Sequence, residues 1–473
     1  MKHLVSAAIV TAFCSHAIAT PVYHPPGPNV TYGSVSNGQT LLSDINNPAA
    51  GALAPLKEGD KVRFGVLSSI GVGVEYGAID NLFDDLDAIA ADFDISNAFS
   101  SIDNINTAAA VTEVNTRIND INDLLNNIED NGYGKAFVSG HIPLMPMIIS
   151  SDTLGGSLTF DMNFSGVVRV GAVADTVAFD LGAAQTFISN NLTSPVPVTS
   201  NIVDPTNNAG IGDVVISAGN NNVTYSLNND SVVRLKAAGV FEAGFGYSRT
   251  VLSANSGNLL AGIRGKYYQV TLYQDVEKVE DETDTENLFE DFDYKDGVTD
   301  TNFGIDLGLL WAGDNYRVGA TFANVNEPDF EYNAIDPTKL ANINDPRISA
   351  LLNQKLVYTM ESQLTIEGAL HSSNQKWVFG AAFDVNEVKG PTGDEYQWAT
   401  ASAAYITKSW VIPGIRLGYR VNQAGSELSY ITGGITLFKY LNLDGAYGLE
   451  DVVIDGSTLP RSFMVNLGLE LSF

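Results

Sequence analysis

The stretch from Arg461 to Phe473 constrains the fold of this chain more than any other. Its apolar residues occupy every second position: Phe463, Val465, Leu467, Leu469, Leu471 and Phe473. Side chains alternate across a strand, so this period of two predicts a β-strand with one apolar and one polar face. A long apolar strand with an open edge invites pairing with other chains, and a closed barrel removes that edge. In a bilayer closure is obligatory, because lipid offers the backbone no hydrogen bonds. The strand therefore favours a membrane barrel over the edge of a soluble β-sandwich.

Fourteen segments in all have the pattern of strands. We expect them at 62–76, 135–149, 156–174, 231–250, 257–275, 300–312, 315–324, 355–371, 376–386, 396–407, 413–423, 427–438, 440–450 and 461–473. Every very long connection follows an odd-numbered strand, and the even-to-odd connections are short. Bacterial outer-membrane barrels have an even strand count, short periplasmic turns and longer outer loops. We therefore predict one all-β transmembrane barrel of about 14 antiparallel strands, with its long loops outside the cell.

The first long connection contains a helical insert at 80–131. Its apolar residues have helical spacing in two runs, which include Leu86 and Ile89 in the first and Ile118, Ile121 and Leu125 in the second. This spacing predicts two amphipathic helices between the first two strands. We expect them to pack along one apolar seam and to cap the mouth of the barrel. The patch 222–228, within the next long connection, is expected to be a hairpin or an isolated strand.

The N-terminal residues predict export. Residues 1–19 combine a basic start, an apolar run and an Ala17-Ile18-Ala19 cleavage pattern, which is typical of a signal peptide. The single cysteine, Cys14, lies inside it, so the mature chain would have no disulfide or thiolate chemistry. Residues 20–60 form an irregular segment, and residues 61–473 form the barrel with its insert. We expect the mature protein in the outer membrane of a Gram-negative bacterium. Leu469, Leu471 and Phe473 would form the C-terminal signal for insertion.

The charged residues bear on which partners the protein can have and on which strand residues face the lumen. A net charge of −30 argues against nucleic acid and suits a surface that meets divalent cations and lipopolysaccharide. The expected partners of the barrel are outer-membrane lipid, lipopolysaccharide and the barrel-assembly machinery. Charged residues on strands are expected to face the lumen, since a cation facing lipid at mid-height costs about 2–4 kcal/mol. These are Arg63, Lys376, Asp384, Arg416, Arg420 and Glu470, together with Arg234 and Lys236. An interfacial girdle is expected from Trp377, Tyr405, Trp410, Tyr419, Tyr430, Phe438, Tyr440, Tyr447 and Phe473.

No motif in the sequence marks an enzyme. The three mature histidines, His24, His141 and His371, lie in separate elements, and no nucleophile–base pair or phosphate-binding loop is recognisable. The carboxylates between Asp275 and Asp300 lack the spacing of an EF-hand loop, which favours a solvated acidic loop. We expect neither a catalytic residue, nor a metal, nor a cofactor.

Two resemblances add to this reading. The motif Asn47-Pro48-Ala49, just before the first strand, resembles the Asn-Pro-Ala motif of FadL-like outer-membrane barrels. That resemblance implies a fourteen-stranded channel for hydrophobic compounds, with the N-terminal segment folded as a plug in the lumen. The segments YGSVSNGQ, NNPAAG, VEYGAIDNLFDDLD, PGIRLGYRVNQAGSELSYITGGITLFKYLNLDGAYGLE and PRSFMVNLGLELSF resemble the barrel form of the conjugal-transfer TraF family. A thioredoxin-like protein shares that name, but the cysteine-free mature chain cannot carry out its chemistry.

Three functions are therefore open at this point. The TraF resemblance implies a non-enzymatic outer-membrane component of conjugal plasmid transfer or pilus assembly, with conjugation proteins as partners. The FadL-like motif implies a channel for hydrophobic small molecules. The long outer loops would also suit a surface receptor or adhesin.

Overall fold

The computed structural model describes residues 25–37, 40–53, 61–80, 108–184, 186, 201–202, 214–219, 222–227, 229–279, 296–407, 409–454 and 456–472. The expected signal peptide, the first helix of the insert with Leu86 and Ile89, and Phe473 lie outside these residues.

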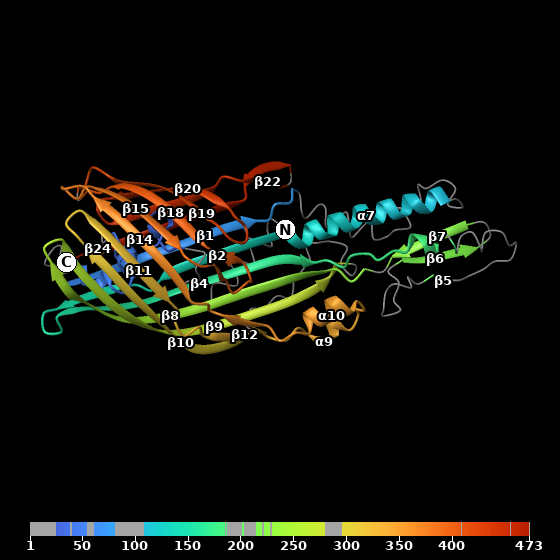
Figure 1. The fold of residues 1–473 in the computed structure, drawn as a ribbon, viewed down its shortest axis with the longest axis horizontal. Helices are drawn as coiled ribbons and strands as arrows, with labels where there is room; N and C mark the ends of the chain where they lie inside the picture. The colour runs from blue at the N-terminus through green and yellow to red at the C-terminus, as the bar shows by residue number, and fades with distance from the viewer. Residues whose placement is uncertain are drawn as a thin grey trace.

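Fourteen strand positions form a closed antiparallel barrel, which confirms the predicted fold class (Figure 1). In chain order the wall consists of β1 (Val62–Tyr76), β2 (Tyr133–His141) with β3 (Met147–Ser151), β4 (Gly156–Val173), β8 (Val232–Ala254), β9 (Gly257–Lys278), β10 (Val298–Ala312), β11 (Tyr316–Ala323), β14 (Gln363–His371), β15 (Trp377–Asp384), β18 (Trp398–Tyr405), β19 (Gly414–Asn422), β20 (Ser429–Leu437), β21 (Leu441–Gly448) and β24 (Ser462–Ser472). The last strand closes the barrel on the first, with Val465 opposite Val72. Closure leaves the wall without a free edge, as a bilayer requires.

The second strand position is interrupted. β1 pairs with β2 from Ile70 onwards and with β3 only up to Phe64. The gap between β2 and β3 contains Pro143 and Pro146, and proline cannot donate a hydrogen bond to a strand ladder. The predicted single strand 135–149 is therefore two shorter strands. Ser68 bridges the gap, because its Oγ donates to the carbonyl oxygen of Met145 at 2.6 Å.

One other predicted strand differs from the structure. The predicted strand 355–371 begins only at Gln363, because β13 (Val357–Thr359) pairs with β12 (Asp329–Glu331) within the loop instead of joining the wall. Both of these short strands belong to the connection between β11 and β14.

The described parts of the long connections lie at one end of the barrel, as the parity argument predicts. A helix and a small sheet project from this end, away from the wall (Figure 1). They are α7 (Ala108–Asn131) and the sheet of β5 (Asn201–Ile202), β6 (Val214–Gly219) and β7 (Asn222–Leu227). We call these elements the projection. The expected patch 222–228 is thus one strand of a three-stranded sheet.

The helix α7 does not lie across the barrel mouth, as the sequence suggested, but points away from it. Ile118, Leu125 and Ile128 are buried at helical spacing. The base of the helix is fixed to the segment after β4, since Asn122 exchanges two hydrogen bonds with the backbone of Val177, at 2.7 and 2.8 Å. Ile128 also packs against Ile79.

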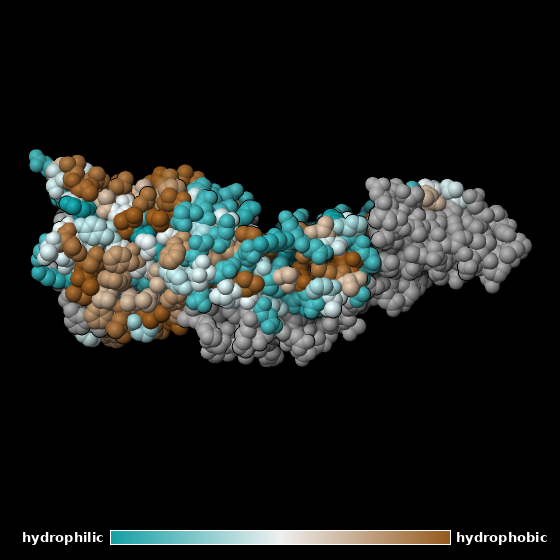
Figure 2. Space-filling view, turned by 90° about the horizontal axis from the view of Figure 1, so that it is seen from below, coloured by the Kyte–Doolittle hydropathy of each residue, from teal (hydrophilic) through white to brown (hydrophobic). Residues whose placement is uncertain are grey.

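The outer face of the wall is apolar. On β10, the outward residues Phe303, Ile305, Leu307 and Leu309 are 41–65% exposed. At alternate positions of the same strand, Asp306 and Leu310 are 6% and 0% exposed. Figure 2 shows this apolar surface gathered over the barrel, with hydrophilic surface beyond it. Apolar residues outside and polar residues inside are the arrangement of a barrel that spans a membrane.

Aromatic side chains gather at the short-turn end of the wall. The ring centroids of Trp377 and Tyr405 are 5.2 Å apart, and those of Trp410 and Tyr440 are 5.7 Å apart. Such rings are typical of the interface between lipid and water. Tyr430 is an exception to the expected girdle, because it faces inwards and is 1% exposed.

The N-terminal segment lies inside the barrel. It contains α2 (Asn29–Tyr32), α3 (Leu41–Ile45) and a 3-10 turn, η1 (Ala50–Leu53). The described part of it, residues 25–37 and 40–53, is called the plug below. Its first helix contacts β18 to β21, while its last turn contacts β4, β8 and β9. The plug therefore reaches the wall on opposite sides.

Candidate functional site

The Asn-Pro-Ala motif fastens the plug to the wall. Asn47 Nδ2 donates to Glu367 Oε1 at 2.9 Å, and it also reaches the carbonyl oxygens of Leu309 and Ala320 at 3.1 and 3.3 Å. Asn47 Oδ1 accepts from the backbone N–H of Ala49 at 2.9 Å, which fixes the turn. The wall has glycines where the motif touches it: a Cβ on Gly262 would lie 2.1 Å from the carbonyl oxygen of Pro48.

Glu367 on β14 joins the motif to a second part of the plug. Its carboxylate accepts from the backbone N–H of Ser36 and, at 2.8 Å, from Ser36 Oγ. Arg317 on β11 donates to the carbonyl oxygen of Ser36 at 2.9 Å. One buried carboxylate therefore holds two turns of the plug that are distant in sequence.

The opposite wall holds the plug through charges that the sequence placed in the lumen. Arg416 makes a two-pronged contact with Asp444, at 2.9 and 2.8 Å, and Asp444 lies 3.5 Å from the hydroxyl of Thr31. Glu470 accepts from the backbone N–H of Leu41 at 2.9 Å. In the same strand, Asn466 accepts from the N–H of Gly27 at 3.2 Å.

Other predicted site residues lie elsewhere. Arg63 is half-buried near the short-turn end of β1, and Asp384 and Arg420 are buried in the lumen. Lys376 is not in the lumen: it lies in the turn before β15 and is exposed, because this strand begins one residue later than predicted. In the C-terminal strand, Leu469 pairs with Leu441, while the side chain of Leu471 and all of Phe473 lie outside the described residues.

Loops close the other end of the barrel. We call them the lid: residues 324–362, which include α9 (Pro337–Leu340) and α10 (Pro346–Leu352), residues 385–397, which include β16 (Val388–Lys389) and β17 (Glu395–Tyr396), and residues 423–428. An apolar core joins the lid to the wall beneath it. It contains Phe330, Tyr332, Tyr358, Met360, Tyr396, Trp398, Leu428 and Tyr430.

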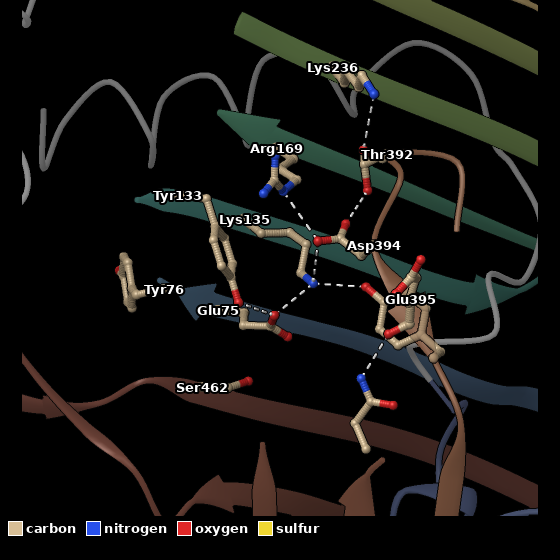
Figure 3. Close-up of polar contacts among 12 residues, drawn as sticks. Glu75, Tyr76, Tyr133, Lys135, Arg169, Lys236, Thr392, Asp394, Glu395 and Ser462 are labelled. Carbon is tan, nitrogen blue, oxygen red and sulfur yellow. Dashed lines mark hydrogen bonds and ion pairs between the residues drawn. The ribbon is translucent and has the colours of Figure 1, made fainter. Parts of the chain in front are cut away.

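A buried charge cluster fastens the lid to the wall (Figure 3). Asp394 of the lid lies 3.2 Å from Arg169 Nε and 3.7 Å from Lys135 Nζ. Lys135 also pairs with Glu75 at 2.8 Å and donates to the hydroxyl of Tyr396 at 2.8 Å. We call this cluster the latch. It spans β1, β2 and β4, whose register places Glu75, Lys135 and Arg169 side by side.

The latch favours an ionised Asp394. Burial alone would raise the pKa of Asp394, but Lys135 and Arg169 outweigh it, helped by a 2.6 Å hydrogen bond from Thr392 Oγ1 and by Lys236, so that the pKa lies below its usual value. Lys236 Nζ lies 3.5 Å from the carbonyl oxygen of Thr392. The lid is thus held by a carboxylate among three cations.

A cavity of about 230 Å³ lies between the plug and the lid. Its floor includes Asn29 and Asn46 of the plug, and its roof includes Tyr358 and Met360 of the lid. Its walls carry many polar and charged side chains, among them His141, Asp161, Asn163, Glu242, Arg264, Lys266, Thr365, Asp384, Thr400 and Arg420. On one wall Arg264 pairs with Asp161 and Glu242, at 2.8 and 2.5 Å.

The described residues show two further absences. None of their helices is both long and apolar enough to cross a membrane. Within the same residues, no group of three or more His, Cys, Asp or Glu side chains could hold a metal ion.

Sequence reasoning missed the latch and the lid. The alternation on the predicted strands did place Glu75 and Lys236 inwards. The position of Asp394 depends on how an irregular loop folds back, and no pattern in the sequence encodes that.

Several solved structures match this chain at low sequence identity. Solved structures similar to this chain include the Pseudomonas putida toluene transporter TodX, with 14% identity and a TM-score of 0.38 over 96% of this chain and 99% of that one. A Pseudomonas aeruginosa FadL homologue has 10% identity and a TM-score of 0.41 over 97% and 99%. The Ralstonia pickettii toluene transporter TbuX has 12% identity and a TM-score of 0.39 over 97% and 99%. No curated protein matches the chain in sequence.

One family model matches most of the chain, from residue 45 to residue 384, and it is described as the F plasmid transfer operon TraF protein. This range begins just before the Asn-Pro-Ala motif and ends at Asp384, so it includes the latch residues of the wall and the whole projection. The chain belongs to this TraF family.

Proposed function

We propose that this protein is a non-enzymatic, gated channel of the outer membrane for small polar solutes. The observation that carries the proposal is the cavity between the plug and the lid, inside a barrel with an apolar outer face. A barrel that served only as an anchor would need no internal chamber with charged walls. We infer that a solute enters where the lid opens and waits in this chamber.

The lining of the cavity favours polar solutes over the hydrophobic compounds that the FadL-like motif implies. Removing a charged or polar group from water is costly unless it regains a partner. An apolar molecule in the chamber would displace water from Asp384, Thr365, Thr400 and Arg420 without replacing its hydrogen bonds. A polar solute can replace those bonds.

Solute influx into proteoliposomes tests the channel. In a matched variant, a short Gly-Ser turn replaces residues 386–397 and so removes the latch side of the lid. We expect the variant to admit small sugars at least about tenfold faster than the wild type, because the part of the lid that the latch holds over the cavity is gone. Heat-modifiable migration on a gel would show that both barrels are folded. Equal, background-level influx through two folded proteins would refute the channel.

The proposed orientation is testable by cysteine labelling, since the only natural cysteine is Cys14. Ala350 is exposed in the lid, and Ser373 is exposed in a turn at the other end. On whole cells, an impermeant maleimide should label Ala350→Cys at once and Ser373→Cys only after the outer membrane is opened. The reverse pattern would show that the lid faces the periplasm.

A role in conjugal plasmid transfer is the second candidate. It is supported by the description of the family that matches residues 45–384. The projection would then be the surface that meets other transfer proteins, because it extends beyond the barrel at the loop end. Deleting the gene should lower the frequency of plasmid transfer. In the deletion strain, a variant with residues 81–131 replaced by a short linker should form the barrel but should not restore plasmid transfer. Full transfer with this variant would exclude the helix as the contact surface.

A further inference from the structure

Arg420 is a buried cation whose partners in the protein are incomplete. It lies on β19, is 2% exposed, and lines the cavity. Its guanidinium carbon lies 3.8 Å from the centre of the Trp398 ring. The Nε and Nη1 atoms are buried and have no hydrogen-bond partner, and no ion pair joins Arg420 to a carboxylate in the described chain. The guanidinium therefore rests on the ring face of Trp398 while two of its nitrogens have no acceptor.

Two other buried arginines of the lumen differ from it. Arg416 forms its two-pronged pair with Asp444, and Arg264 pairs with two carboxylates. This is the usual arrangement, because a charge removed from water is costly unless it is paired and hydrogen-bonded. Arg420 lies on the same face of β19 as the paired Arg416, four residues further along the strand. Its position on the strand alone therefore does not explain the missing partner.

The nearest acidic residue of the cavity wall is already engaged. Asp384 accepts from Thr365 Oγ1 at 2.7 Å through one oxygen and from the backbone N–H of Trp398 at 2.9 Å through the other. The indole Nε1–H of Trp398 also has no acceptor. This wall of the cavity therefore carries unsatisfied donors from two adjacent side chains, Arg420 and Trp398.

We propose that this wall is the binding site for a small organic carboxylate, which deepens the proposed channel by naming the class of its solute. The carboxylate would accept from Arg420 and from Trp398 Nε1, with modest local adjustment of the two side chains. The apolar body of the ligand would lie against Tyr358, Met360 and Ala382, which line the same cavity. The volume of about 230 Å³ suits one small molecule, or about eight water molecules at roughly 30 Å³ each.

The other two cations that line the cavity are paired with carboxylates. Arg264 pairs with both Asp161 and Glu242, and Lys266 pairs with Asp306 at 2.6 Å. Arg420 differs from them, because it has no ion pair among the described residues and its donors are left for a ligand. A neutral or cationic ligand of the same shape would gain nothing from it.

Equilibrium dialysis of the detergent-solubilised full chain tests the site with three probes of similar shape: benzoate, toluene and benzylamine. We expect benzoate to bind in preference to the other two. Arg420→Gln should weaken benzoate binding by about 10- to 100-fold, as the loss of a hydrogen bond to a charged group predicts. Arg420→Lys keeps the charge and should recover part of the affinity, and Trp398→Phe should weaken binding by a smaller factor.

The control is Arg249→Gln, which removes the same charge from an exposed position of β8 outside the cavity. It should leave benzoate binding unchanged. Equal binding of benzoate and toluene, or benzoate binding that survives Arg420→Gln, would overturn the carboxylate site. The absence of binding by all three probes would also overturn it, and would indicate that water alone solvates Arg420.

This test is independent of the influx test. Benzoate binding that depends on Arg420, in a protein that admits no solute even without residues 386–397, would uphold the site and refute the channel. Influx without selective benzoate binding would uphold the channel and refute the site.

Discussion

The plug and the lid close the same lumen by different means. The plug is held on opposite sides of the barrel, by Glu367 and Arg317 on one side and by Asn466 and Glu470 on the other. In the loop 385–397 of the lid, the charged contacts to the wall are concentrated at the latch, where Asp394 meets Lys135 and Arg169. The loop 324–362 is held separately, through the ion pairs of Lys339 with Asp275 and Glu277 on β9.

This difference indicates which closure opens. Releasing the plug requires many separate hydrogen bonds on distant strands to break together. The loop 385–397 has one charged anchor in the wall, Asp394 in the latch, and is otherwise held by hydrogen bonds and by the packing of Tyr396. We therefore expect the lid to be the gate and the plug to be a permanent part of the wall.

The largest effect is expected from Glu367→Ala. Each buried donor left without an acceptor costs about 1–3 kcal/mol. The change leaves Ser36 N and Ser36 Oγ without this acceptor and removes one of the three acceptors of Asn47 Nδ2. This side of the plug should loosen, and single-channel conductance in a planar bilayer should rise. Unchanged conductance in a folded barrel would show that the plug does not depend on this anchor.

A smaller effect is expected from Asp394→Ala in the lid. Lys135 keeps Glu75 and Tyr396 as partners. The free energy that holds the loop to the wall should therefore fall by about 1–3 kcal/mol, the cost of one hydrogen bond to a charged group. Limited proteolysis should then cut within residues 385–397 while the barrel stays resistant. If the loop is cut no faster than in the wild type, the latch does not hold the lid.

Acidification should open the wild-type lid only at low pH. The pKa of Asp394 lies below its ordinary value of 3.8, so the stability that its ionised form contributes is complete above that value and is lost as the pH falls through the folded pKa. Proteolysis of the loop 385–397 should therefore be constant from about pH 8 to pH 5. A marked rise within that range would assign the latch to a different titrating group.

The smallest effect is expected from Lys389→Ala, which serves as the matched control for the latch. Lys389 pairs with Glu395 at 3.1 Å in the same loop, but the two side chains are 57% and 37% exposed. Exposed pairs contribute about 0–1 kcal/mol. Loop proteolysis should match the wild type within error; a change as large as that of Asp394→Ala would mean that any charge in this loop matters.

The sequence predicted the strands of the barrel wall better than the contacts of the plug and the lid inside the barrel. The period of two located all fourteen strand positions and the side on which the long loops lie, since alternation and loop length are local properties. It could not separate Tyr430 in the lumen from Tyr419 at the surface by residue type, because aromatic residues suit both places. Within its strand, however, Tyr430 alternates with Ile431, which faces outwards. This alternation could have excluded Tyr430 from the predicted girdle.

The contents of the lumen depended on contacts that span the whole chain. The inward position of Arg420 follows from the strand pattern, but its lack of a partner emerges only when Asp384 is seen bonded to Thr365 and to the backbone of Trp398. The interruption between β2 and β3 could have been foreseen, because Pro143 and Pro146 are visible in the sequence. The latch could not, since Asp394 is brought to Lys135 across 259 positions of the chain by an irregular loop.

The plug's contacts with the last strand impose an order on folding. Gly27 bonds to Asn466 and Leu41 to Glu470, partners that are 439 and 429 positions apart. Contacts of such long range form slowly, because the intervening chain must first lose its freedom. Once β24 has paired with β1, the ring is shut and the plug can be threaded only through the narrow lumen. We therefore expect the N-terminal segment to lie against the open sheet before β24 pairs with β1, so that the barrel closes around it.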